Sequence, residues 1–202
     1  MKNFVSSHIP LRLIRHATLS LLSMVMIVGC SPESHSPTTG SSARPKNQAE
    51  VTPGEWTVGI KESGSRFTCT VDTVLIGRKH SGDENANTHY KCATLSQFGK
   101  PVTTDEPLTS DNIKESGSEY VCPTNMVMVG REHDGDENGN TRYKCAFLNG
   151  PMGQLQVAPG AWSAGQAESD HSLECAGNQV LVGRKHDGDE NGHTYHKCAT
   201  LW

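Results

Sequence analysis

One constellation of polar residues occurs three times in this 202-residue chain, at intervals of 53 residues. Each copy reads Gly-Arg, Lys or Glu, His, one further residue and then Gly-Asp-Glu-Asn. Guanidinium, imidazole, carboxylate and amide groups this close together can bind a polar ligand, hold a cation or bind one another. The candidate ligand-binding residues are Arg78, His80, Asp83 and Asn85 in the first copy, Arg131, His133, Asp136 and Asn138 in the second, and Arg184, His186, Asp189 and Asn191 in the third.

A cation site is one interpretation of the acidic turns. Oxygen ligands at alternate positions, with a Gly between them, match the first half of a calcium-binding loop. The twelfth position, a Glu in an EF-hand, is a Cys here, so the expected site is looser than an EF-hand. Calcium is the only cofactor indicated, and its candidate ligands are Asp134, Asp136 and Asn138 in the second copy and Asp187, Asp189 and Asn191 in the third.

A structural interpretation of the same residues stays open beside it. Each arginine lies five or six residues before the Asp-Glu pair of its turn, so its guanidinium could bind a turn carboxylate through two hydrogen bonds. The histidine could donate to the same turn. The hairpin would then be a rigid scaffold with Asn87, Asn140 and His193 facing outward.

Zinc and catalysis are disfavoured. Zinc ligands usually come in closely spaced pairs, whereas each copy has Cys-x10-His-x11-Cys, and oxidised cysteines cannot bind the ion. Catalysis generally needs one asymmetric pocket. Three near-copies of one constellation fit multivalent binding better, so we do not expect an enzyme.

The longer repeat around each constellation predicts how it is positioned. Residues 77–95 and 183–201 are identical at 14 of 19 positions, whereas residues 58–76 and 164–182 share only 6 of 19. Each unit has an apolar β-forming run before the acidic turn and an alternating or aromatic run after it. The Asp, Asn and Gly residues between the runs favour a tight turn. The sequence therefore predicts an all-β chain.

Three tandem units of about 53 residues follow from the repeat, at 51–103, 104–156 and 157–202. They either close around a pseudo-threefold axis, in a trefoil-like manner, or stand as separate beads. Closure is favoured because a unit of this size buries little surface alone. Trp56 and Trp162 occupy equivalent positions and are expected to fill gaps at the unit borders, with exposed sugar-stacking platforms as the alternative.

Six of the seven cysteines belong to the repeats, two in each. In an exported chain an even number of cysteines indicates disulfides, and strict repetition favours one bridge per unit. A chain with only 34% hydrophobic and 5% aromatic residues also needs such bridges. The expected pairs are Cys69 with Cys92, Cys122 with Cys145, and Cys175 with Cys198.

The N-terminus reads as an export signal. Residues 1–29 combine basic residues with an apolar stretch too short to span a bilayer. The following motif, Ile27-Val28-Gly29-Cys30, resembles the lipobox of bacterial lipoproteins. That resemblance implies a diacylated Cys30, palmitate included, at the mature N-terminus, and Ser31 after it implies sorting to the outer membrane. Residues 30–50, rich in Ser, Pro, Thr and Gly, are expected to form a flexible tether.

The repeated order of apolar run, His, acidic turn, aromatic residue and Cys resembles the motif of dermatopontin-type extracellular proteins. The resemblance covers about twenty residues in each unit. The Asp-Arg-x-Trp core of that family is replaced by Asp-Glu-Asn, for example at Asp136 to Asn138. The resemblance implies an extracellular β-domain that binds carbohydrate or matrix.

Charge narrows the class of partner. Removal of residues 1–29 removes three basic residues and no acidic one, which changes the formal net charge from −4 to −7. Such a protein is a poor nucleic-acid binder. We expect a lipid-anchored outer-membrane protein, facing the periplasm or the cell surface, whose three equivalent polar hairpins bind a glycan. The alternatives are a structural or protein-interaction lipoprotein that docks an envelope or surface protein, and a calcium-binding repeat protein.

Overall fold

The computed structural model describes residues 45–136, 138–189 and 191–202, which belong to one compact unit. The predicted signal segment and Cys30 lie outside the described residues. The described residues form strands and one 3-10 turn, and contain no α-helix, which confirms the all-β prediction. None of the described residues forms a helix of the length and hydrophobicity that a membrane span requires.

The three repeats contribute similar sets of elements. The first contains β1 (Glu50–Trp56), β2 (Ile60–Lys61), the 3-10 turn η1 (Glu62–Gly64), β3 (Arg66–Thr68), β4 (Thr73–Ser81), β5 (Asn87–Gln97) and β6 (Lys100–Pro101). The second contains β7 (Thr103–Thr104), β8 (Leu108–Thr109), β9 (Ile113–Lys114), β10 (Glu119–Val121), β11 (Met126–Asp134), β12 (Asn140–Gly150) and β13 (Gly153–Gln154). The third contains β14 (Val157–Trp162), β15 (Gln166–Ala167), β16 (Asp170–Glu174), β17 (Gln179–Asp187) and β18 (His193–Leu201).

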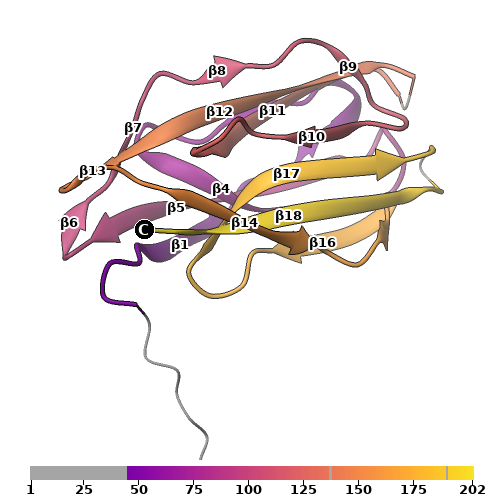
Figure 1. Cartoon of the computed structure of the whole chain (residues 1–202). Coiled ribbons are helices and arrows are strands. Elements are labelled where there is room, and N and C mark those ends of the chain that lie inside the picture. Colours follow the sequence, from indigo (N-terminus) through magenta and orange to yellow (C-terminus); the bar gives the residue numbers. More distant parts are fainter. Residues whose placement is uncertain (1–44, 137, 190) are drawn as a thin grey trace, which may run out of the picture. The chain divides into compact units, whose positions relative to one another are not determined.

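The dominant element of each repeat is the long antiparallel hairpin across the acidic turn. These hairpins are β4–β5, β11–β12 and β17–β18. Figure 1 shows β11–β12 and β17–β18 running the same way, with their turns at the same end. The hairpins confirm the predicted strands and turns. These elements could be predicted because they depend on local sequence.

The repeats exchange strands in a cycle. β3 of the first repeat pairs with β11 of the second, β10 of the second with β17 of the third, and β16 of the third with β4 of the first. The result is three sheets, and β4, β11 and β17 also contact one another. The closed pseudo-threefold arrangement is therefore confirmed over separate beads, since every repeat completes a neighbour's sheet.

Each central strand points alternate side chains at the pseudo-threefold axis. Val74, Ile76, Arg78 and His80 of β4 are all buried, and a register shift between Leu75 and Gly77 separates the apolar pair from the polar pair. The apolar members of these rows join a single core cluster. Further along the same rows the side chains become Arg and then His, beside the turn. The equivalent rows are Val127, Val129, Arg131 and His133 in β11, and Val180, Val182, Arg184 and His186 in β17.

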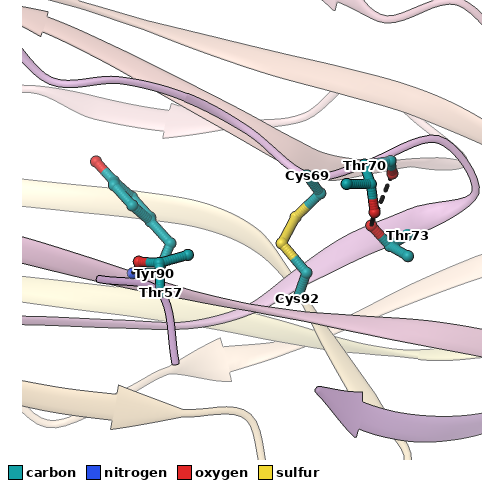
Figure 2. The surroundings of a disulfide bond; sticks show 6 residues. All are labelled: Thr57, Cys69, Thr70, Thr73, Tyr90 and Cys92. Atoms are coloured by element: carbon teal, nitrogen blue, oxygen red, sulfur yellow. Dashed lines mark hydrogen bonds between the residues drawn. A yellow bond between two sulfur atoms is a disulfide. The ribbon is translucent and has the colours of Figure 1, made fainter. Parts of the chain in front are cut away.

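The three disulfides form the predicted pairs, Cys69–Cys92, Cys122–Cys145 and Cys175–Cys198. Figure 2 shows the first, which joins the chain just after β3 to β5. Because β3 belongs to the sheet of β11, this bridge lies within one repeat in sequence but connects two sheets in space. Near it, Tyr90 donates its backbone N–H to Thr57 and stacks on Phe67 at 4.4 Å between ring centroids.

Trp56 and Trp162 each pack inside a sheet, at the border between its own strands and the strand from another repeat. The tip of Trp56 lies over Gly77, which also faces the carbonyl of Leu173 in the exchanged strand β16, so a side chain larger than hydrogen at position 77 would collide with both. Lys79 and Lys91 lie over the Trp56 ring. The expected border-filling role is confirmed.

The ordered unit begins earlier than the predicted tether boundary at residue 50. Ala49 is fully buried and donates its N–H to the carbonyl of Leu201. Glu50 already pairs with Ser96 in β1–β5. The composition of residues 30–50 did not predict that this end of the segment packs on the domain, because one small buried residue, Ala49, is enough to anchor it to the core.

Candidate functional site: a closed ring of ion pairs beneath the acidic turns

Three buried arginines and three buried glutamates alternate in a closed ring on the axis. Arg78 binds Glu62 at 2.9 Å and Glu168 at 2.9 Å. Arg131 binds Glu62 at 2.7 Å and Glu115 at 3.0 Å. Arg184 closes the ring by binding Glu168 at 2.9 Å and also Glu115. Each of the six side chains is less than a tenth exposed. Every glutamate bridges two arginines, one from its own repeat and one from a neighbour, so the ring locks all three repeats together.

The backbone fixes the glutamates. The N–H of Glu62 donates to the carbonyl of Ala86, and those of Glu115 and Glu168 donate to Gly139 and Gly192 in the equivalent turns. The backbone of each glutamate is therefore held by a hydrogen bond to the acidic turn of its own repeat. Its carboxylate points to the axis, where the arginine row ends.

For Arg78 the predicted contact with a turn carboxylate is wrong, and within the described residues Arg131 and Arg184 make none either. The arginines bind the ring glutamates, because their side chains face the axis while Asp83, Asp136 and Asp189 of the turns are exposed. In the turns, the Oδ1 atoms of Asp83, Asp136 and Asp189 instead accept the backbone N–H two residues on, from Asn85, Asn138 and Asn191 at 2.9, 2.8 and 2.9 Å.

Sequence reasoning missed Glu62, Glu115 and Glu168. Their signal was present, because Lys-Glu-Ser-Gly-Ser occurs at residues 61–65 and again at 114–118, and Glu-Ser recurs 53 residues later. A repeated charged pentapeptide in the variable half of a repeat is evidence that the charge has a buried partner. Only the fold identifies that partner.

The histidines of the constellation lie beside the ring and hold the turns. His80 Nε2 lies 3.0 Å from the carbonyl oxygen of Gly82, and His186 Nε2 lies 3.2 Å from that of Asp189. A carbonyl only accepts, so these contacts place the ring hydrogen on Nε2. The prediction that the histidines donate to the turns is confirmed for these two residues.

Each arginine of the ring has a further hydrogen-bond partner, and that of Arg78 differs from those of Arg131 and Arg184. Arg131 donates to the hydroxyl oxygen of Tyr90 at 3.4 Å, and Arg184 donates to that of Tyr143 at 3.3 Å. The equivalent residue in the third repeat is His196, and there Arg78 donates instead to His171 Nε2 at 2.7 Å. His171 occupies the position of Ser65 and Ser118, so two substitutions in the third repeat compensate each other.

Burial and charge set the protonation of the site. Burial alone would raise the pKa of Glu115 and Glu168, but the flanking guanidiniums outweigh it and hold both well below 4.5. Burial and Arg78 lower the pKa of His171 to about 3. Burial and the nearby arginine likewise lower the pKa of His80 and His133. For His186, burial is outweighed by Glu115 and Glu168, and its pKa rises to about 9.

A small cavity of about 30 Å³ lies between the ring and the turns. It brings together predicted residues from different repeats and the glutamates that were not predicted. Its lining residues are Glu62, Glu115 and Glu168 of the ring, His80, His133 and His186, and Asp83, Glu84 and Asp136 of the turns.

The predicted calcium ligands lie at the exposed turns, outside this cavity apart from Asp136. Asp134 binds Arg66 at 2.7 Å, and Asp187 lies 3.1 Å from Lys185 Nζ. Several oxygens that calcium would need are thus engaged within the protein. Calcium binding by Asp134, Asp136 and Asn138, or by Asp187, Asp189 and Asn191, stays a prediction.

Acid is expected to destabilise the fold progressively below pH 6.5. His171 titrates near 6.5 when unfolded but near 3 when folded, so between these values the unfolded chain binds more protons and stability falls as pH falls. The ring glutamates act in the same direction below pH 4.5. His186 acts oppositely but in another window, because its stabilisation is complete below 6.5 and is lost as pH rises toward 9.

The repeats themselves supply the variant that checks this. His171→Ser with His196→Tyr rebuilds the third border as the other two are built. Urea unfolding at pH 7 and pH 5 should show a smaller loss of stability for the double variant than for the wild type, while the exposed variant His193→Ser keeps the wild-type loss. Equal losses in all three proteins would contradict the assignment to His171.

No protein-family model, curated protein or solved structure matches this chain, so the lipobox and dermatopontin resemblances stay predictions.

Proposed function

We propose that this protein is a lipid-anchored binding protein that takes a neutral or amino-bearing glycan at its hairpin end. The observation that carries the proposal is a polar groove of about 560 Å³ beside the first acidic turn, where the first and third repeats meet. Asn87, His89, Asp170 and Ser172 line it. Amide, imidazole, carboxylate and hydroxyl groups are the partners that sugar hydroxyls need.

Charge selects among glycans. Asp83, Asp136 and Asp189 are exposed on the turns, together with Asp134 and Asp187. A surface of this sign attracts an amino sugar and repels uronic or sialic acids. The ring of buried ion pairs beneath it keeps the three turns in one fixed arrangement, which lowers the ordering cost of binding.

A glycan array followed by calorimetry tests the proposal. Asn87→Ala and Asp170→Ala change exposed groove residues and should each weaken binding about tenfold, because each removes hydrogen bonds to the sugar. Asn140→Ala is the matched control, since Asn140 is the exposed equivalent of Asn87 in the second repeat. If no carbohydrate binds at millimolar concentration while an envelope protein co-purifies, the protein-interaction alternative holds.

The anchor is a separate part of the proposal. It rests on the lipobox-like motif at Cys30 and on the Ser- and Pro-rich segment after it. Cys30→Ser should move the protein from the membrane to the soluble fraction. Radiolabelled palmitate on that variant would show that the lipid is attached elsewhere.

A further inference from the structure

Four electron-pair donors around the axial cavity are buried and lack a hydrogen-bond partner within the described part of the chain. They are Glu62 Oε2, Glu115 Oε2, His80 Nδ1 and His133 Nδ1. All four residues line the cavity and are more than nine-tenths buried. A buried acceptor without a partner is costly, so a convergent group of them is evidence for a positively charged ligand.

Two neighbouring groups of cavity atoms are spaced as the ligands of a small ion are: His133 Nδ1 with Glu115 Oε2, and His186 Nδ1 with Glu115 and Glu168. His133 Nδ1 lies 3.9 Å from Glu115 Oε2, and His186 Nδ1 lies 3.6 Å from Glu115 Oε1 and 3.5 Å from Glu168 Oε2. Glu115, Glu168 and His186 offer ligand atoms that all lie within 4.8 Å of one another. Two ligands at about 2.0–2.1 Å from a tetrahedral ion are roughly 3.4 Å apart, so small side-chain shifts suffice.

The histidines are oriented as metal ligands are. Nε2 of His80 faces a turn carbonyl, which leaves Nδ1 of the neutral ring as the free electron pair on the cavity side. His186 faces the Asp189 carbonyl in the same way, but its Nδ1 already contacts Glu115 and Glu168, so this ring must lose a proton to bind an ion. A metal-bound imidazole almost always donates its other nitrogen to a carbonyl or carboxylate in this way. The turn carbonyls would therefore orient the metal-binding histidines by accepting hydrogen bonds from their Nε2 atoms.

The surrounding charge permits a cation. In the ring the three guanidiniums are matched by three carboxylates. Among the other lining residues, His186 carries a positive charge because its pKa is about 9, while the carboxylates of Asp83, Glu84 and Asp136 add negative charge at the mouth of the cavity and outnumber it. A divalent ion would therefore enter a site whose net charge is favourable.

We propose that the axial cavity binds one first-row divalent transition-metal ion through histidine Nδ1 atoms and ring carboxylate oxygens. Imidazole together with carboxylate favours zinc, nickel or cobalt over calcium, which prefers an all-oxygen site. The site uses no cysteine. It shares His80 with the glycan groove and Asp136 with the oxygen ligands predicted on the turns, whereas His133 and the ring glutamates belong to the cavity and not to the groove. The ion would tie the three repeats together on the side of the ring that faces the turns.

Titration of the purified protein with Zn²⁺ alone, followed by calorimetry, tests the site, and Co²⁺ reports its geometry by absorption. One ion per chain is expected, with a rise in melting temperature. His80→Gln keeps a donor for the Gly82 carbonyl but removes Nδ1, and should weaken Zn²⁺ binding about tenfold or more. His133→Gln gives a second, independent variant in case the first does not fold.

His193→Gln is the matched control, because His193 is exposed on β18 and does not line the cavity. It should bind Zn²⁺ as the wild type does. Three results would overturn the proposal: wild-type affinity in folded His80→Gln and His133→Gln, loss of binding in His193→Gln, or a melting shift with Ca²⁺ and none with Zn²⁺. Glycan binding is measured separately on the same variants. Because His80 also lines the groove, His133→Gln is the variant that distinguishes failure of the metal site from failure of the glycan site.

Discussion

Arg131→Ala is expected to reduce the free energy of unfolding by about 3–5 kcal/mol. Arg131 is 1% exposed and binds Glu62 at 2.7 Å and Glu115 at 3.0 Å. Its removal leaves two buried carboxylates short of a partner and opens a cavity where the guanidinium was. Because both glutamates also bind the other arginines, the loss spreads around the ring.

Arg142→Ala is the matched control. Arg142 belongs to the same hairpin, but its side chain is 37% exposed where it binds Glu132. An exposed ion pair contributes at most about 1 kcal/mol. Urea unfolding of both variants at pH 7 gives the comparison. Equal losses for the two substitutions would mean that the buried ring adds nothing beyond an ordinary surface pair.

Removal of all three disulfides is expected to unfold the protein at ordinary temperature. Each bridge closes a loop between cysteines 23 residues apart, which corresponds to about 3 kcal/mol by restriction of the unfolded chain. Three bridges approach the total stability of roughly 5–15 kcal/mol that is usual for a domain. Each bridge also holds a strand in a neighbour's sheet, so its loss weakens the cyclic exchange.

A graded series separates these effects. The Cys69→Ala/Cys92→Ala pair should keep the native near-ultraviolet circular dichroism and lose about 3 kcal/mol in urea unfolding. The wild type in excess reductant should lose the native spectrum. A fully reduced protein with wild-type stability would show that the core and the ring hold the repeats together unaided.

The local sequence determined the strands, the turns and the disulfide pairs. An apolar β-forming run at residues 74–76 is followed by Gly, Asp and Asn at the turn and by a second β-forming run, so the hairpin is specified within about twenty residues. The pairing of Cys69 with Cys92 is also specified locally, because strict repetition favours one disulfide within each repeat. Signals of this kind need no knowledge of the neighbouring repeat.

The tertiary structure decided which charges meet. Arg131 and Glu62 are 69 residues apart and come together only because β3 crosses into the sheet of β11. From sequence the nearer turn carboxylates were the natural partners of the arginines, and that inference was wrong. Strand exchange between repeats depends on packing across the axis rather than on local pattern. The ring and the axial cavity are therefore properties of the closed fold, which brings together histidines that the sequence had already indicated.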